Sequence, residues 1–118
     1  MTDRELLKLA AKAAGISLYI EPMSPGCQFE EDRKLYSDLR GSVEWNPLTD
    51  DGDALRLAVK LMMTVLADPG IDASVAAQID PPTSPLTSVW ADELAEPDPY
   101  AATRRAIVRA AAEIGKQL

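Results

Sequence analysis

The chain has no histidine and only one cysteine, Cys27, among its 118 residues. These shortages exclude zinc sites built from the usual cysteine and histidine ligands, a histidine general base, and both serine and cysteine triads. Because Cys27 has no second cysteine to pair with, it forms no intrachain disulfide, which fits a reducing compartment. The chemistry that remains is that of oxygen ligands for hard cations and of paired carboxylates.

Long apolar runs are also missing. No stretch approaches the roughly 18 residues that a bilayer span requires, and the first residues lack the basic and apolar regions of a signal peptide. Hydrophobic residues make up 47% of the chain and charged residues 26%, which is typical of a globular protein. We therefore expect a single domain over residues 1–118, located in the cytoplasm, with no membrane partner and no cofactor.

Basic residues are absent from the middle of the chain, between Lys60 and Arg104, and the net charge is −7. The acids in this interval are Asp68, Asp72, Asp80, Asp92, Glu93, Glu96 and Asp98. A negative field of this kind repels phosphate backbones, so direct binding of nucleic acid is not expected. Basic residues return near the C-terminus, as Arg104, Arg105, Arg109 and Lys116. We interpret this group as a solvated face or as salt-bridge partners, since Arg105 and Arg109 are four residues apart and can pair with the acidic segment; an anion or nucleic-acid site is the alternative.

Capping signals predict the first and last helices. Residues 2–5 have the form of a capping box, and Gly15 is placed to end a helix over residues 3–14. Asp98 followed by Pro99 predicts the start of a helix that runs to the C-terminus. Its expected apolar face consists of Tyr100, Thr103, Ile107, Ala111, Ile114 and Leu118.

A cluster of acids predicts the start of a central helix. Asp50, Asp51 and Asp53 suit a helix N-terminus as cap and dipole partners. They could instead bind calcium, but an EF-hand loop needs a glycine and a distal glutamate that this segment lacks. We expect the helix to end near residues 68–70. Its predicted buried face consists of Leu55, Ala58, Val59, Met62 and Leu66.

Short alternating segments predict strands. They cover residues 16–20, 35–39, 42–45, 71–79 and 86–90. Tight links between neighbouring strands cannot make parallel crossovers, so we expect a mostly antiparallel sheet. With three helices packed on it, the fold class is α+β.

Two tryptophans and two acidic loops bear on function. Trp45 is expected in the core, whereas Trp90 fits either the core or an interface. The acids at 30–32 and at 92–93 are expected to lie on loops in solvent, where nothing tunes them for acid–base catalysis. An enzyme is therefore not expected.

Three segments together resemble the small phage proteins grouped as the phage ABA sandwich domain. They are TDRELLKLAAKAAG at 2–15, WNPLTDDGDALRLAVKL at 45–61 and DPYAATRRAIVRAAAEIGK at 98–116. The resemblance implies an α/β/α sandwich, which agrees with the antiparallel sheet of about four to five short strands packed by three helices that the sequence pattern predicts. It implies a phage-encoded protein and carries over no catalytic residues. The intervals 22–40 and 67–97 are longer and richer in proline and acid than these segments require.

These observations lead us to expect a non-enzymatic phage accessory protein that binds a host or phage protein. A defence system such as CRISPR-Cas is one target, since a negative surface competes for a basic groove in a nucleic-acid-binding effector. The alternative is a self-assembling structural module, for example a homodimer without a host target. The residues expected to contact a partner are Glu30, Glu31, Asp32, Asp80, Trp90, Asp92, Glu93 and Glu96.

Overall fold

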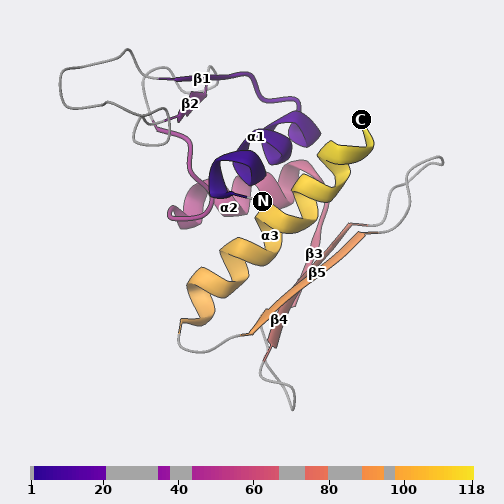
Figure 1. Ribbon diagram of the computed structural model, residues 1–118. Coiled ribbons are helices and arrows are strands. Elements are labelled where there is room, and N and C mark those ends of the chain that lie inside the picture. The colour runs from indigo at the N-terminus through magenta and orange to yellow at the C-terminus, as the bar shows by residue number, and fades with distance from the viewer. Residues whose placement is uncertain (1, 21–34, 38–43, 67–73, 80–88, 95–97) are drawn as a thin grey trace.

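The computed structural model describes residues 2–20, 35–37, 44–66, 74–79, 89–94 and 98–118 (Figure 1). The helices are α1 (Asp3–Ala14), α2 (Asp51–Lys60) and α3 (Pro99–Gln117). The strands are β1 (Leu18–Ile20), β2 (Leu35–Ser37), β3 (Thr64–Leu66), β4 (Ser74–Ile79) and β5 (Val89–Leu94). Within these residues, no helix is long and apolar enough to cross a membrane.

The ends of α1 and the start of α3 confirm the capping predictions. The N–H of Glu5 donates to the Thr2 hydroxyl at 3.2 Å, while the Thr2 N–H donates to the Glu5 carboxylate at 3.0 Å. Gly15 ends α1 in the left-handed conformation, with φ 72°. At the start of α3, the Asp98 carboxylate accepts from the N–H groups of Tyr100 and Ala101. These are local interactions, and the sequence spacing alone specifies them.

The core is centred on the packing of α1 against α3, and it uses small residues. Both helices bury alanines: Ala10, Ala11 and Ala14 in α1, and Ala106, Ala110, Ala111 and Ala112 in α3. Gly115 completes the contact, because a Cβ placed there would lie 2.8 Å from the backbone carbonyl carbon of Leu9. The two backbones can approach this closely only because little side-chain volume separates them.

Strand pairing is antiparallel throughout the described sheets. β1 pairs with β2, and β3, β4 and β5 form a separate sheet in that order. α3 packs on the second sheet, and Figure 1 shows α1 on the opposite side of α3 from that sheet. The predicted α+β class and antiparallel pairing are confirmed. A single sheet of four to five strands is not, because the described strands divide into two and three.

β5 corrects the predicted strand at 86–90. Residues 86–88 lie outside the described part of the chain, and β5 continues from Val89 through Asp92 and Glu93 to Leu94. We expected the two acids to lie on a loop after the strand. Glu93 is accommodated in the sheet because arginines of α3 lie opposite its carboxylate, as described below.

The end of α2 is the second correction. The predicted helix continued to about residue 68, but α2 ends at Lys60 and residues 64–66 form β3 instead. The N–H of Met62 donates to the Val59 carbonyl and that of Met63 to the Ala58 carbonyl. This pair of bonds is the Schellman arrangement, which requires a left-handed residue, and Met62 has φ 53°. Gly15 has the same role after α1, so the sequence signal that marked one helix end is missing at the other.

Gly115→Ala is expected to destabilise the fold. Alanine normally stabilises a helix interior relative to glycine by up to about 1 kcal/mol, but here the added methyl group collides with the Leu9 backbone. We expect a loss of about 2–3 kcal/mol in the free energy of unfolding, measured by urea denaturation.

Gly52→Ala is the matched control for that substitution. Gly52 also lies in a helix, but its added Cβ would meet only the ends of the Arg56 and Asp50 side chains, which can move aside. We expect it to be neutral or slightly stabilising. Equal effects of the two substitutions would contradict the close packing of α1 on α3.

Met62→Gly is expected to stabilise the fold, although it removes a large side chain. A left-handed conformation is unfavourable for an L-residue by roughly 1–2 kcal/mol, and glycine avoids that strain. The Met62 side chain is exposed, so little burial is lost. We expect Met62→Gly to be about 1 kcal/mol more stable than Met62→Ala, which lacks the same side chain but keeps the strain. Thermal unfolding of the two variants measures this difference; a more stable alanine variant would refute the assigned backbone conformation.

Candidate functional site

The acids at the start of α2 serve the structure, as their capping interpretation predicts. Asp50 is the N-cap and accepts from the Asp53 N–H at 2.8 Å. Asp53 is 4% exposed; its carboxylate accepts from the Asn46 N–H at 2.9 Å and pairs with Arg56 at 2.7 Å. Asp51 pairs with Arg104 of α3. Asp50 and Asp53 thus share Arg56, which lies 3.7 Å from the Asp50 carboxylate, whereas Asp51 faces α3. No group of three potential metal ligands occurs among the described residues.

Asp53 holds the segment that leads into α2. This segment contains Trp45, whose side chain is buried as predicted. The backbone N–H of Trp45 donates to the Leu35 carbonyl at 2.8 Å. Pro47 is also fully buried. The backbone N–H of Asn46, which lies between Trp45 and Pro47, donates to the buried Asp53 carboxylate. This hydrogen bond fixes the start of α2 relative to Trp45.

The residues expected to contact a partner fall into three groups. Glu93 lies in β5, and its carboxylate pairs with Arg109 at 2.7 Å and Arg105 at 3.6 Å. Trp90 and Asp92 lie in β5 opposite Gln78 and Ala76 of β4, and their side chains are outside the described part. The others lie outside the described residues altogether: Glu30, Glu31, Asp32, Asp80 and Glu96.

The prediction that arginines of the last helix pair with acids of the middle segment is confirmed for Arg105 and Arg109, which both pair with Glu93. Arg105 also pairs with Asp3 of α1 at 3.1 Å, and Arg104 pairs with Asp51 at 2.6 Å. The Glu93 charge is thus offset within the molecule. Its role as a partner contact stays a prediction.

An apolar surface on α2 is the feature that the sequence interpretation missed. Leu55, Val59 and Met62 were assigned to the buried face, yet they are 65%, 68% and 73% exposed. The buried residues of α2 are Asp53, Ala54, Leu57 and Ala58, so the prediction is confirmed for Ala58 and wrong for Leu55, Val59 and Met62. We call Leu55, Val59 and Met62 the α2 apolar surface. Exposed apolar groups that gather in this way are typical of interaction sites.

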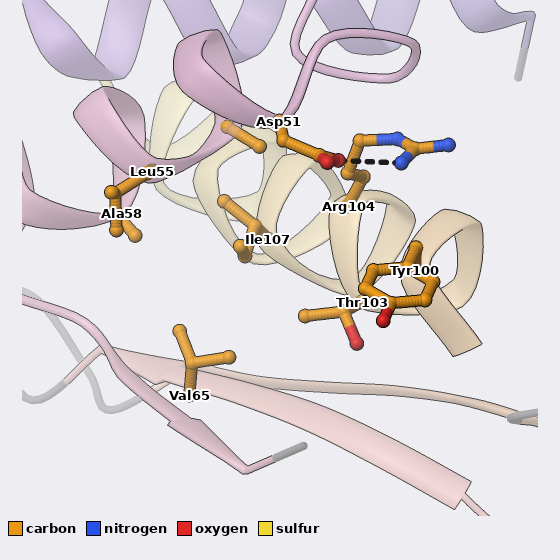
Figure 2. A pocket seen from close by; sticks show the side chains of 9 residues that line it. Asp51, Leu55, Ala58, Val65, Tyr100, Thr103, Arg104 and Ile107 are labelled. Carbon is orange, nitrogen blue, oxygen red and sulfur yellow. Dashed lines mark hydrogen bonds and ion pairs between the residues drawn. The ribbon is translucent and has the colours of Figure 1, made fainter.

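A pocket of about 270 Å³ adjoins this surface, between α2, α3 and β3 (Figure 2). The residues around it are Asp51, Ala54, Leu55, Ala58, Val65, Tyr100, Thr103, Arg104 and Ile107. In Figure 2, Val65 projects from β3 toward Ile107 of α3, with Leu55 and Ala58 of α2 beside them. The small side chains of Ala54 and Ala58 leave space between α2 and α3 that longer side chains would fill.

Three polar side chains at the pocket, those of Asp51, Thr103 and Arg104, form bonds within the fold. The Thr103 hydroxyl donates to the Pro99 carbonyl at 2.7 Å, and Arg104 donates to the Leu48 carbonyl at 2.8 Å as well as to Asp51. Tyr100 lies at the end of the pocket and is 71% exposed. The arrangement offers apolar contact with a charged rim, which suits binding better than bond-making chemistry.

One signal in the sequence could have indicated this surface. Between positions 54 and 62, every residue except Arg56 and Lys60 is apolar. Such a helix has more apolar circumference than one buried face needs, so part of it must be exposed or covered by a partner.

Comparisons with protein-family models, with curated proteins and with solved structures found no match to this chain.

Asp53→Ala is expected to destabilise the fold much more than Asp51→Ala. The first substitution leaves the Asn46 N–H without its acceptor and removes a hydrogen bond to a buried charge, a loss of about 1.5–3 kcal/mol. The second removes an ion pair whose carboxylate is mostly exposed, a loss below about 1 kcal/mol. Urea denaturation of both variants measures the difference. Similar losses would show that Asp53 is not the residue that holds this segment.

Proposed function

We propose that this chain is a non-enzymatic protein-binding module, and that it binds through the α2 apolar surface and the adjoining pocket. The observation that carries the proposal is the exposure of Leu55 and Val59 along α2 and of Met62 just beyond its end. Apolar side chains in this position contribute little to folding. On binding, their removal from water would contribute roughly 25 cal/mol per Å².

The conformation of Met62 supports the proposal independently. A left-handed methionine is strained, its side chain is exposed, and a glycine would serve the helix end better. Strain of this kind tends to occur at functional positions. A role for the Met62 side chain in contacting a partner explains why the strain is tolerated.

The chemistry of the chain supports a non-enzymatic role. There is no histidine to act as a base, and the carboxylates of Asp51, Asp53 and Glu93 each form an ion pair with an arginine. Carboxylates that are paired in this way have a structural role and are not free to act as a general acid or base.

The biological setting of the proposal comes from the resemblance to the phage ABA sandwich domain. On that basis the module is a phage accessory protein acting in the host cytoplasm, and its partner is a component of a host defence system such as CRISPR-Cas. The same resemblance carries the finer fold assignment, an α/β/α sandwich with one sheet of four to five strands. The net charge of −7 supports a partner with a basic surface.

The test is affinity capture from a host lysate with the wild-type chain and two variants. Leu55→Asp places a charge where the α2 apolar surface meets the pocket, whereas Leu118→Asp places the same charge at another exposed leucine, at the end of α3. We expect a protein that the wild type and Leu118→Asp retain but that Leu55→Asp loses by tenfold or more, as expected for an interface hot spot.

Two further results bear on the proposal. Thermal unfolding must show that Leu55→Asp is folded, since Leu55 is largely exposed and its substitution should leave the core intact. If no captured protein distinguishes the two variants, the proposed surface is wrong. Self-association is the alternative function, and light scattering decides it: a dimer disrupted by Leu55→Asp would assign the surface to a second copy of the chain.

A further inference from the structure

The charge that faces solvent at the pocket rim is negative, although an arginine belongs to the rim. Asp51 and Arg104 pair at 2.6 Å, but the Asp51 side chain is 73% exposed and that of Arg104 only 17%. Nε of Arg104 donates to the Leu48 carbonyl, so protein acceptors hold the guanidinium on two sides. Figure 2 shows the pair at the edge where α2 meets α3. A ligand that approaches the pocket rim from solvent therefore contacts the Asp51 carboxylate before the Arg104 guanidinium.

The nearby cations on α2 do not cancel this field at the pocket. Arg56 lies 2.7 Å from Asp53 and 3.7 Å from Asp50, so its charge is offset there. Lys60 follows Arg56 by one helical turn, on the flank of α2 away from Ala54 and Ala58. Asp51 and Arg104 are the charged residues that line the pocket itself.

The size of the pocket restricts what can fill it. Its volume of about 270 Å³ lies just below the usual 300–1,000 Å³ of sites for drug-sized ligands. The α2 apolar surface extends beyond the pocket and would remain in water around a small molecule. A single apolar side chain of a protein partner fills the pocket while the rest of that partner covers Leu55 and Val59.

We propose that the pocket accepts an apolar side chain of a partner protein, and that a lysine or arginine next to it pairs with Asp51. This inference rests on the proposed function and adds the chemistry of the partner. The net charge of −7 favours a basic partner over a second copy of the chain, because two copies repel one another.

The experiment selects short peptides from a random displayed library against the purified full chain. The selected peptides are then titrated by calorimetry against the wild type and Leu55→Asp, Asp51→Asn and Lys60→Gln variants. We expect selected peptides to share a large apolar residue with a lysine or arginine beside it. Leu55→Asp should abolish binding, and Asp51→Asn should weaken it about three- to fivefold, with a smaller effect at high salt.

A double-mutant cycle tests the ion pair directly. A peptide in which glutamine replaces the basic residue should also bind the wild type three- to fivefold more weakly, but should bind Asp51→Asn with no further loss. Lys60→Gln is the control for net charge: it removes a charge from the same helix and should leave affinity unchanged or slightly higher.

The outcomes separate the inference from the function on which it rests. Peptides that require Leu55 but bind Asp51→Asn as tightly as the wild type, or show independent losses in the cycle, would overturn the inference and leave the proposed function standing. Selection of no peptide, or of peptides that are insensitive to Leu55→Asp, would overturn both.

Discussion

The close approach of α1 to α3 is the contact on which the other packing depends. Alanines line both helices, and Gly115 lies against the backbone of Leu9, so the distance between the two helices is set by backbone contact. Once α3 is fixed on this side, its remaining surface is available for α2 and for the sheet of β3, β4 and β5. A core built from small side chains gains its stability from close packing over the length of two helices, because each alanine buries little area by itself.

The same residue type has the opposite effect between α2 and α3. Here the spacing is set by other contacts: Asp53 binds the Asn46 N–H, and Arg104 of α3 binds the Leu48 carbonyl and Asp51. The bonds of Arg104 hold the start of α2 near α3. Ala54 and Ala58 then leave a gap, and that gap is the pocket. The candidate site is therefore a consequence of how polar groups position α2.

Electrostatics divides the acids of the chain into internal and external ones. Glu93 pairs with arginines of α3 and so helps to join β5 to that helix. Asp53 pairs with Arg56 of its own helix and accepts from the Asn46 N–H, which joins the preceding segment to α2. Asp51 has both roles, because one oxygen pairs with Arg104 while most of its side chain remains in solvent. An acidic composition alone therefore does not identify a binding surface. The surface that we propose for binding combines an exposed acid with exposed apolar side chains.

The sequence by itself determined the elements whose signals are local. The capping box before α1, Gly15 after it and Asp98-Pro99 before α3 involve residues within a few positions of one another, so their spacing specifies their geometry. Burial of Trp45 followed from its size, and the capping role of the acids before α2 from the helix dipole.

Only the tertiary structure decided where α2 ends and which of its faces is buried. Two residues after the end of α2, Met62 has a conformation that usually calls for glycine, and residues 64–66 leave the helical pattern to pair with β4. Both Leu55 with Val59 and Ala54 with Ala58 satisfy helical periodicity, and the choice between the two faces depends on contacts with α3 that are remote in sequence. Likewise, β5 continues through Glu93 because the arginines that offset its charge come from α3. In each case, contacts with residues remote in the sequence stabilise the observed arrangement. Short-range sequence patterns therefore could not reveal the exposed surface that we propose as the binding site.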